Sequence, residues 1–262
     1  MLDQILANAP LYLLIAVRAL AMIEVAPLIS SDSIPQVAKV AMAGFVAFAV
    51  FPTAASIDLP QDVFNLTYLF MVIGEAFIGI IIGFYLTIIY SAFSSAGQFF
   101  SLQMGFGASE TYDPLAQIEN PLMGQYLNLI GMLVFLSIDG FQQLFLGGFQ
   151  RSVQSFNVLR LATAQEGILS LMIKGLSQLF IDALVISMPI LGTLFLISIA
   201  MGLLSKAAPQ INLLTEGFPI SIIVAFILIL TTMPYLIETF ANVINGGFKT
   251  LQTFIASIGG PL

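Results

Sequence analysis

The segment Gly97–Asn120, GQFFSLQMGFGASETYDPLAQIEN, is a polar interruption between two strongly apolar stretches, and the rest of the chain is organised around it. Connections longer than about 12 to 15 residues are uncommon unless they are lids, binding loops or linkers. A solvated linker is a poor fit, because the segment holds several large apolar side chains: Phe99, Phe100, Met104, Phe106 and Tyr112. Two interpretations stay open for residues 98–120. They form a central plug or gate loop that moves on its glycines, or an ordinary extramembrane loop folded on its own aromatic rings.

The composition places the chain in a membrane. Of its 262 residues, 59% are hydrophobic and 8% are charged, whereas soluble domains carry about 25% charged residues. The net charge of −7 comes without any basic run, which argues against nucleic acid as a partner. We therefore predict an all-α integral membrane protein with a single helical membrane domain over residues 1–262.

The chain contains no cysteine and no histidine. It therefore lacks the thiol nucleophile, the thiolate ligand and the imidazole that serves most often as general base and metal ligand. We predict that the protein is not an enzyme and has no catalytic residue, metal or cofactor. A membrane enzyme that works with carboxylates alone remains a third possibility after the two functions weighed below.

The first apolar stretch, residues 10–29, carries two charges, Arg18 and Glu24. Its aliphatic residues favour insertion by about 3 to 6 kcal/mol, while two central charges cost about 5 to 7 kcal/mol, so the helix needs protein around it. Six positions place the two side chains about 120° apart on a helix, so they should not pair with each other. Each is expected to find a partner on another helix or another subunit.

The remaining apolar stretches differ in length. Residues 36–56 suit one span, with Lys39 near its start able to extend to the interface. Two stretches, residues 63–97 and 168–204, are too long for one span of about 20 residues. They must tilt, bend or leave the membrane. The expected features are residues 63–97 with packing glycines at Gly74, Gly79 and Gly83; 121–146 with a break at Asp139; 147–167, partly an amphipathic helix; 168–204 with a kink or hairpin at Pro189; 220–245 broken by Pro234; and a short C-terminal amphipathic helix over 246–262.

Six ionisable residues fall within apolar runs: Arg18, Glu75, Asp139, Lys174, Asp182 and Glu238. Such groups usually face a bundle interior or an aqueous cavity. In a stand-alone secondary transporter they would be coupling-ion or proton sites. In an obligate complex they would pair across subunits and fix register. Mixed signs favour the second interpretation, because acids and bases together do not make a simple proton path.

Four stretches resemble one known family, the FliR/SctT (SpaR/YscT/HrcT) subunits of the flagellar and type III secretion export gate. They are RALAMIEVAPLISSDSIPQVAK from Arg18 to Lys39, GEAFIGIIIGF from Gly74 to Phe84, FSLQMGFGASETYDP from Phe100 to Pro114, and KAAPQINLLTEGFPISI from Lys206 to Ile222. Lys39 and Ser221 stand where a family member often has arginine and lysine, which puts in doubt any ion pair assigned to either position.

The resemblance implies a non-enzymatic subunit of a protein export gate in the bacterial inner membrane, within the flagellar basal body. It implies long kinked helices and helical hairpins completed by FliP-like and FliQ-like subunits, with an FlhB-like subunit also expected. Unfolded secreted proteins would be the substrates. The choice between flagellum and injectisome stays open, with flagellar use favoured.

The resemblance also implies roles for particular residues, which carry over by position. The plug or gate residues would be Met104, Gly105, Phe106, Gly107, Glu110, Tyr112, Asp113 and Pro114. The residues for assembly with other subunits would be Arg18, Glu75, Lys206, Pro209, Gln210, Asn212, Phe218 and Pro219.

Overall fold

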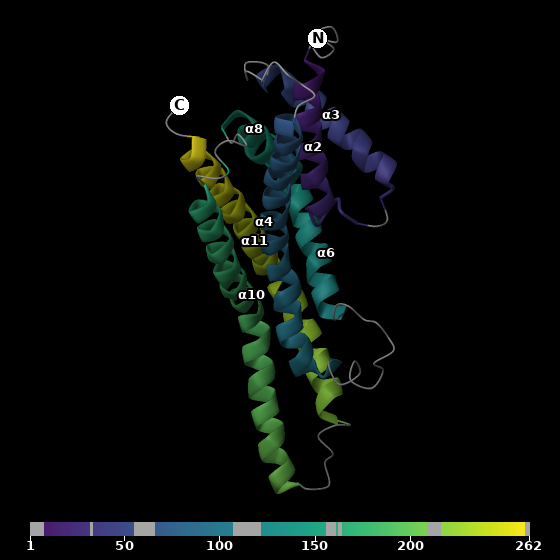
Figure 1. Ribbon diagram of the computed structural model, residues 1–262. Helices are drawn as coiled ribbons and strands as arrows, with labels where there is room; N and C mark the ends of the chain where they lie inside the picture. Colours follow the sequence, from purple (N-terminus) through teal and green to yellow (C-terminus); the bar gives the residue numbers. More distant parts are fainter. Residues whose placement is uncertain are drawn as a thin grey trace. The chain divides into compact units, whose positions relative to one another are not determined.

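The computed structural model describes residues 8–31, 34–54, 66–106, 122–155, 161, 164–208 and 216–259. Over these residues the protein is built from helices and contains no strand (Figure 1), so the all-α prediction is confirmed. The helices are α2 (Ala9–Val25), α3 (Gln36–Ala54), α4 (Leu66–Met104), α6 (Leu122–Ser137), α7 (Gly140–Gln142), the π-helix η1 (Gln143–Gln150), α8 (Arg151–Ser155), α10 (Gln165–Ala207) and α11 (Phe218–Gly259).

Four of the described helices are long and apolar enough to cross a membrane: α3, α4, α10 and α11. The broken pair Leu122–Ser137 and Gly140–Ser155 passes the same test when its two parts are counted together. The multi-pass character expected from the composition is therefore confirmed. The 17-residue helix α2 is shorter than these candidates.

Two of the helices are much longer than the sequence breaks suggest. α10 runs for 43 residues through Pro189 and α11 for 42 residues through Pro234. The hairpin considered at Pro189 and the break expected at Pro234 are therefore wrong, because long membrane-type helices tolerate proline where neighbouring groups satisfy the freed backbone. The expected separate C-terminal helix is also wrong, since residues 246–259 continue α11. Its apolar face is confirmed, because Phe248, Leu251 and Ile255 are buried.

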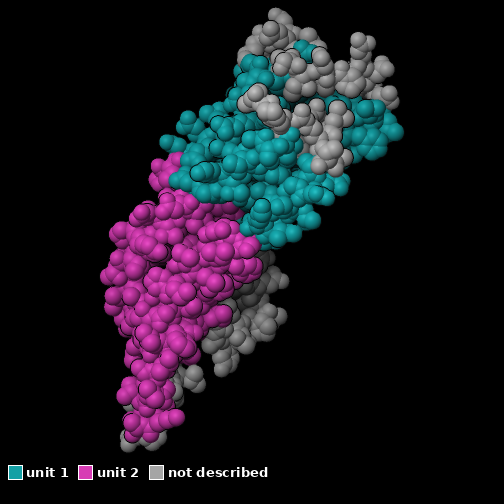
Figure 2. All heavy atoms as spheres, turned by 90° about the vertical axis from the view of Figure 1, so that its left-hand side faces the viewer, with its two compact units in different colours: residues 1–88, 139–176, 245–262 teal, residues 89–138, 177–244 magenta. Residues whose placement is uncertain are grey.

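The chain divides into two compact units, each made of discontinuous segments (Figure 2). Unit 1 comprises residues 1–88, 139–176 and 245–262, and unit 2 comprises residues 89–138 and 177–244. The helices α4, α10 and α11 each contribute residues to both units. The single domain over residues 1–262 stays a prediction.

Unit 1 is organised around α2. This helix packs against α3 and runs antiparallel to it, since the Tyr12 hydroxyl donates to the Gly44 carbonyl at 3.0 Å while Lys39 pairs with Glu24. It runs parallel to α4, because the contacts from Pro10 to Val25 follow the same direction along residues 68–87.

Unit 2 contains an antiparallel helix hairpin of α4 and α6. A Cβ added at Gly97 would lie 2.5 Å from the backbone of Gly124 and Met123, so the two helices touch through their main chains. Farther along, Tyr90 packs edge to face on Phe135 with ring centroids 5.9 Å apart. Residues 98–104 belong to α4, so the expectation that the loop begins at residue 98 is wrong. The hairpin leaves residues 106 and 122, on either side of the remaining central segment, on neighbouring helices.

The expected interruption near Asp139 is confirmed. α6 ends at Ser137, and Asp139 has a left-handed backbone with φ of 54°. The chain then continues through α7 into η1 and α8. Asp139 itself is exposed.

Candidate functional site

The face of α4 that meets α2 is built from four residues at four-residue spacing, Glu75, Gly79, Gly83 and Thr87. A Cβ added at Gly79 would collide with the Arg18 carbonyl, and one at Gly83 would lie 2.8 Å from the carbonyl of Met22. The Thr87 hydroxyl donates to the Val25 carbonyl at 3.0 Å. The helix-packing interpretation of Gly79 and Gly83 is therefore confirmed, because missing side chains let two backbones approach closely.

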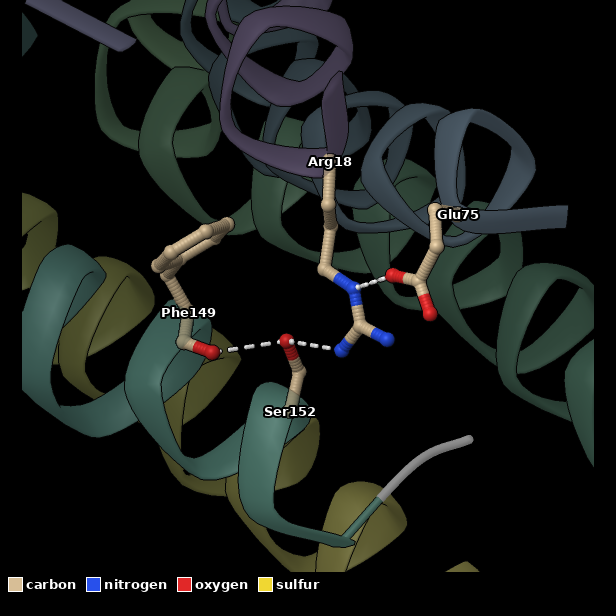
Figure 3. Close-up of polar contacts among 4 residues, drawn as sticks. All are labelled: Arg18, Glu75, Phe149 and Ser152. Atoms are coloured by element: carbon tan, nitrogen blue, oxygen red, sulfur yellow. Dashed lines mark hydrogen bonds and ion pairs between the residues drawn. The ribbon is translucent and has the colours of Figure 1, made fainter. Parts of the chain in front are cut away.

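This close approach brings Arg18 of α2 against Glu75 of α4 (Figure 3). The Arg18 Nε donates to Glu75 Oε2, and a terminal guanidinium nitrogen donates to Ser152 Oγ of α8 at 3.2 Å. Ser152 Oγ in turn donates to the Phe149 carbonyl at 2.7 Å. Arg18, Glu75 and Ser152 are 2%, 7% and 0% exposed, so we call these three side chains the Arg18 cluster, a polar junction of three helices inside unit 1.

The Arg18 cluster satisfies a charge that would otherwise be costly to bury. An unpaired buried charge is strongly unfavourable, while a hydrogen-bonded pair of opposite charges is tolerated. The prediction that Arg18 does not pair with Glu24 is confirmed, since its partner lies on another helix. The partner nevertheless belongs to the same chain, which corrects the expectation that these charges pair across subunits.

Lys39 of α3 forms a second ion pair with α2, through Glu24. Its Nζ lies 3.2 Å from Glu24 Oε2 and donates to the Ser30 carbonyl at 3.1 Å. Lys39 is 2% exposed, so the expectation that it extends to the interface is wrong. The doubt about an ion pair at this position is also resolved, since the lysine does form one.

The other charges within apolar runs do not gather into one site. Asp139, Lys174 and Glu238 are exposed, and Asp182 is half-buried and accepts a hydrogen bond from Gln178 at 2.8 Å. Within the described part of the chain there is no group of three or more acidic, histidine or cysteine residues that could hold a metal ion.

Three of the predicted plug residues lie at the end of α4. Met104 is fully buried in unit 2, and Phe106 is half-buried. Gly105 has φ of 90°, and the Phe218 ring occupies the place where a Cβ would stand. Gly105 therefore ends α4 in a conformation that favours glycine. The other predicted plug residues lie outside the described residues: Gly107, Glu110, Tyr112, Asp113 and Pro114.

The predicted assembly residues fall into three groups. Arg18 and Glu75 form the buried cluster just described. Lys206 and Pro219 are exposed, and Phe218 is half-buried against Gly105. Outside the described residues lie Pro209, Gln210 and Asn212. Phe218 thus joins the beginning of α11 to the end of α4, so that two stretches carrying the family resemblance meet within unit 2.

Ser152 and Thr87 take part in this packing, but the sequence reasoning did not single them out. Thr87 could have been found, because it continues the four-residue spacing of Glu75, Gly79 and Gly83. Ser152 carries no comparable signal, since a serine in a short polar helix is common and its partner lies 134 positions away.

Known proteins match this chain over nearly its whole length. The model for bacterial export proteins, family 1, matches residues 9–247. The flagellar biosynthetic protein FliR of Bacillus subtilis (strain 168) is 28% identical over 261 residues, covering 98% of this chain and 99% of that protein. FliR of Escherichia coli (strain K12) is 27% identical over 258 residues, covering 98% and 97%. FliR of Borreliella burgdorferi is 31% identical over 191 residues, covering 72% of this chain and 71% of that protein.

Proposed function

The chain belongs to family 1 of the bacterial export proteins, and we propose that it is a subunit of the flagellar protein export gate. In this role it forms part of the channel for unfolded export substrates and works in the bacterial inner membrane, at the flagellar basal body. The observation that carries the proposal is its end-to-end similarity to proteins named flagellar biosynthetic protein FliR.

The lengths of the helices support assembly with other subunits. α4, α10 and α11 have 39, 43 and 42 residues, which correspond to about 58 to 65 Å at a rise of 1.5 Å per residue. The hydrocarbon core of a bilayer is about 30 Å thick. Lipid alone does not cover apolar helix faces of this length, so protein partners are the better match.

The exposed residues of α10 illustrate the point. Large apolar side chains recur along the helix from near its first turn to near its last: Leu169, Ile173, Phe180, Met188, Phe195, Ile199 and Leu203 are all at least 46% exposed. Exposed apolar faces of this kind mark contacts with protein or with the membrane, and a face longer than the hydrocarbon core needs protein beyond it. We assign them to FliP-like and FliQ-like subunits, with an FlhB-like subunit as a further neighbour.

We further propose that residues 98–120 contribute the plug that closes this channel. The packing beside the segment supports this role, because the Gly105–Phe218 contact holds the end of α4 and the α4–α6 hairpin holds the helices before and after the loop. A firmly held base allows a loop to return to the same closed position after it has been displaced.

The test is purification of the tagged chain from membranes of its native bacterium, followed by mass measurement of the intact assembly. The expected result is one stable complex that contains this chain together with FliP-like and FliQ-like subunits. A chain that is recovered alone as a single species, and that binds or moves a small solute, would overturn the proposal and support a stand-alone transporter.

A further inference from the structure

The segment that carries Ser152 includes an unusual helix. Residues Gln143–Gln150 of η1 form a π-helix, in which each backbone hydrogen bond reaches one residue farther than in an α-helix. The short helices α7 and α8 flank it, so the chain enters and leaves the wide turns through ordinary helix. π-Helices are rare and occur frequently at functional sites.

Polar contacts hold η1 at its C-terminal end. Ser152, in the first turn of α8, donates to the carbonyl of Phe149 at 2.7 Å and accepts from Arg18 at 3.2 Å (Figure 3). The Arg18 cluster therefore fixes the position at which the π-helix gives way to α8.

Contacts with α11 hold the side of η1 that faces this helix. Gln143 Nε2 donates to Asn245 Oδ1 at 3.1 Å, and an Arg151 guanidinium nitrogen donates to Gln252 Oε1 at 3.4 Å. A Cβ added at Gly147 would collide with the Gln252 amide. The Gln252 side chain thus lies directly on the glycine in the middle of the wide turns.

These contacts could break without leaving a buried charge alone. If Ser152 moved away, Arg18 would keep its ion pair with Glu75, because the two bonds use different guanidinium nitrogens. The contacts to α11 are exposed and join polar side chains. The backbone at Asp139 is already non-helical. A one-residue shift of the helix that follows can therefore be absorbed at this break.

We propose that residues 140–155 form a register switch with a π state and an α state. In the π state seen here, Arg18 holds Ser152 and Gln252 covers Gly147. In the α state η1 tightens into an α-helix, which shifts the residues before it by roughly one position, about 100° around the axis. Leu144 then takes the place of Gln143 beside Asn245. This inference does not depend on the export function.

The absence of native cysteine makes thiol cross-linking in native membranes a clean test. The pair Gln143→Cys and Asn245→Cys reports the π state, and the pair Leu144→Cys and Asn245→Cys reports the α state, each with a short bifunctional thiol reagent. In the otherwise unchanged chain, the first pair should cross-link efficiently and the second poorly. Deletion of Gly148, which removes the extra residue of the wide turns, should close η1 into an α-helix with Gln143 still beside Asn245. This variant should therefore keep the preference for the first pair.

Ser152→Ala should lower the yield of the π-state pair several-fold and raise that of the α-state pair. The matched control is Ser187→Ala, because Ser187 is equally buried and bonds to Leu184 of its own helix. This control should leave both yields unchanged.

Gln252→Ala is an independent variant, because Gln252 is half-buried and contacts η1 at Gly147. It tests the register switch if Ser152→Ala does not accumulate. It should also shift cross-linking from the first pair to the second. Unchanged yields in either accumulating variant would overturn the proposal, as would loss of the first cross-link without gain of the second.

Discussion

Arg18 and Glu75, 57 residues apart in the chain, form a buried ion pair between two parallel helices. Their helices meet through Gly79 and Gly83, so the pair and the glycine contacts belong to the same interface. The charge pair and the close backbone approach therefore depend on each other, and both can be tested by substitution.

The ion pair should show strong coupling in a double-mutant cycle. The single variants Glu75→Met and Arg18→Met each leave one charge buried without its partner, which should destabilise the protein by about 3–5 kcal/mol. The double variant should be more stable than either single variant, because it buries no unpaired charge. Thermal unfolding of the purified complex in detergent measures the difference. Additive effects of the two sites would show that the pair is not coupled.

The two ion pairs of α2 should differ in their contribution to stability. The Glu75 side chain is 10% exposed, whereas that of Glu24 is 35% exposed. Water screens the more exposed carboxylate, and partly solvated pairs contribute about 1 kcal/mol or less. Glu24→Gln should therefore lower the unfolding temperature much less than Glu75→Gln. Equal losses would contradict this ranking.

Alanine in place of a packed glycine of α4 should destabilise the protein, whereas alanine in place of a helical glycine with free space beside it should not. Gly79→Ala places a methyl group against the Arg18 carbonyl, and such overpacking costs about 1–3 kcal/mol. Gly192 of α10 is the matched control, because a Cβ added there meets nothing within 4 Å. Gly192→Ala should be neutral or stabilising by up to about 1 kcal/mol through helix propensity. Unfolding midpoints of both variants give the signs, and a destabilising Gly192→Ala would contradict the packing argument.

These residues also show how far sequence reasoning reached. The buried charges of Arg18 and Glu75 were found because they interrupt apolar runs, whereas the burial of Lys39 was missed. The 120° angle between Arg18 and Glu24 correctly excluded their pairing. The partner of Arg18 was not identified, because the residues between it and Glu75 include segments whose course the sequence does not specify. A line of Glu75, Gly79, Gly83 and Thr87 at constant spacing was the available signal.

The errors came mostly from rules learned on water-soluble helices. Proline ends such helices by removing a backbone donor and clashing with the preceding turn, yet α10 continues through Pro189 and α11 through Pro234. The separate C-terminal helix expected to begin at Gly246 is likewise absent, because α11 continues through this residue. The π-helical geometry of η1 could not be predicted from the sequence, because π and α turns accept the same residues.

Gly105 should tolerate no side chain where α4 ends. Its φ of 90° disfavours any residue with a Cβ, at a cost of about 1–2 kcal/mol, and the Phe218 ring fills the space beside it. Gly105→Ala should therefore lower the unfolding temperature. Adding Phe218→Ala should relieve the collision and recover part of the loss, but the backbone penalty should remain. No recovery in the double variant would show that the ring is not the obstacle.

The central segment should close the channel without holding the complex together. We would replace residues 107–120 with a short glycine and serine linker, which keeps Gly105 in contact with Phe218 and keeps the α4–α6 hairpin. The complex should still purify intact, because its packing residues lie in the helices. Its conductance in planar bilayers should rise, since Tyr112 and the other residues that we assign to the plug beyond Phe106 are gone.

The control is the same kind of replacement in residues 56–62, a second polar connection, which should leave conductance low. An intact complex that stays closed after replacement of residues 107–120 would exclude these residues as the plug. A complex that falls apart would instead assign this segment to assembly, because its loss would then break subunit contacts before any passage opened.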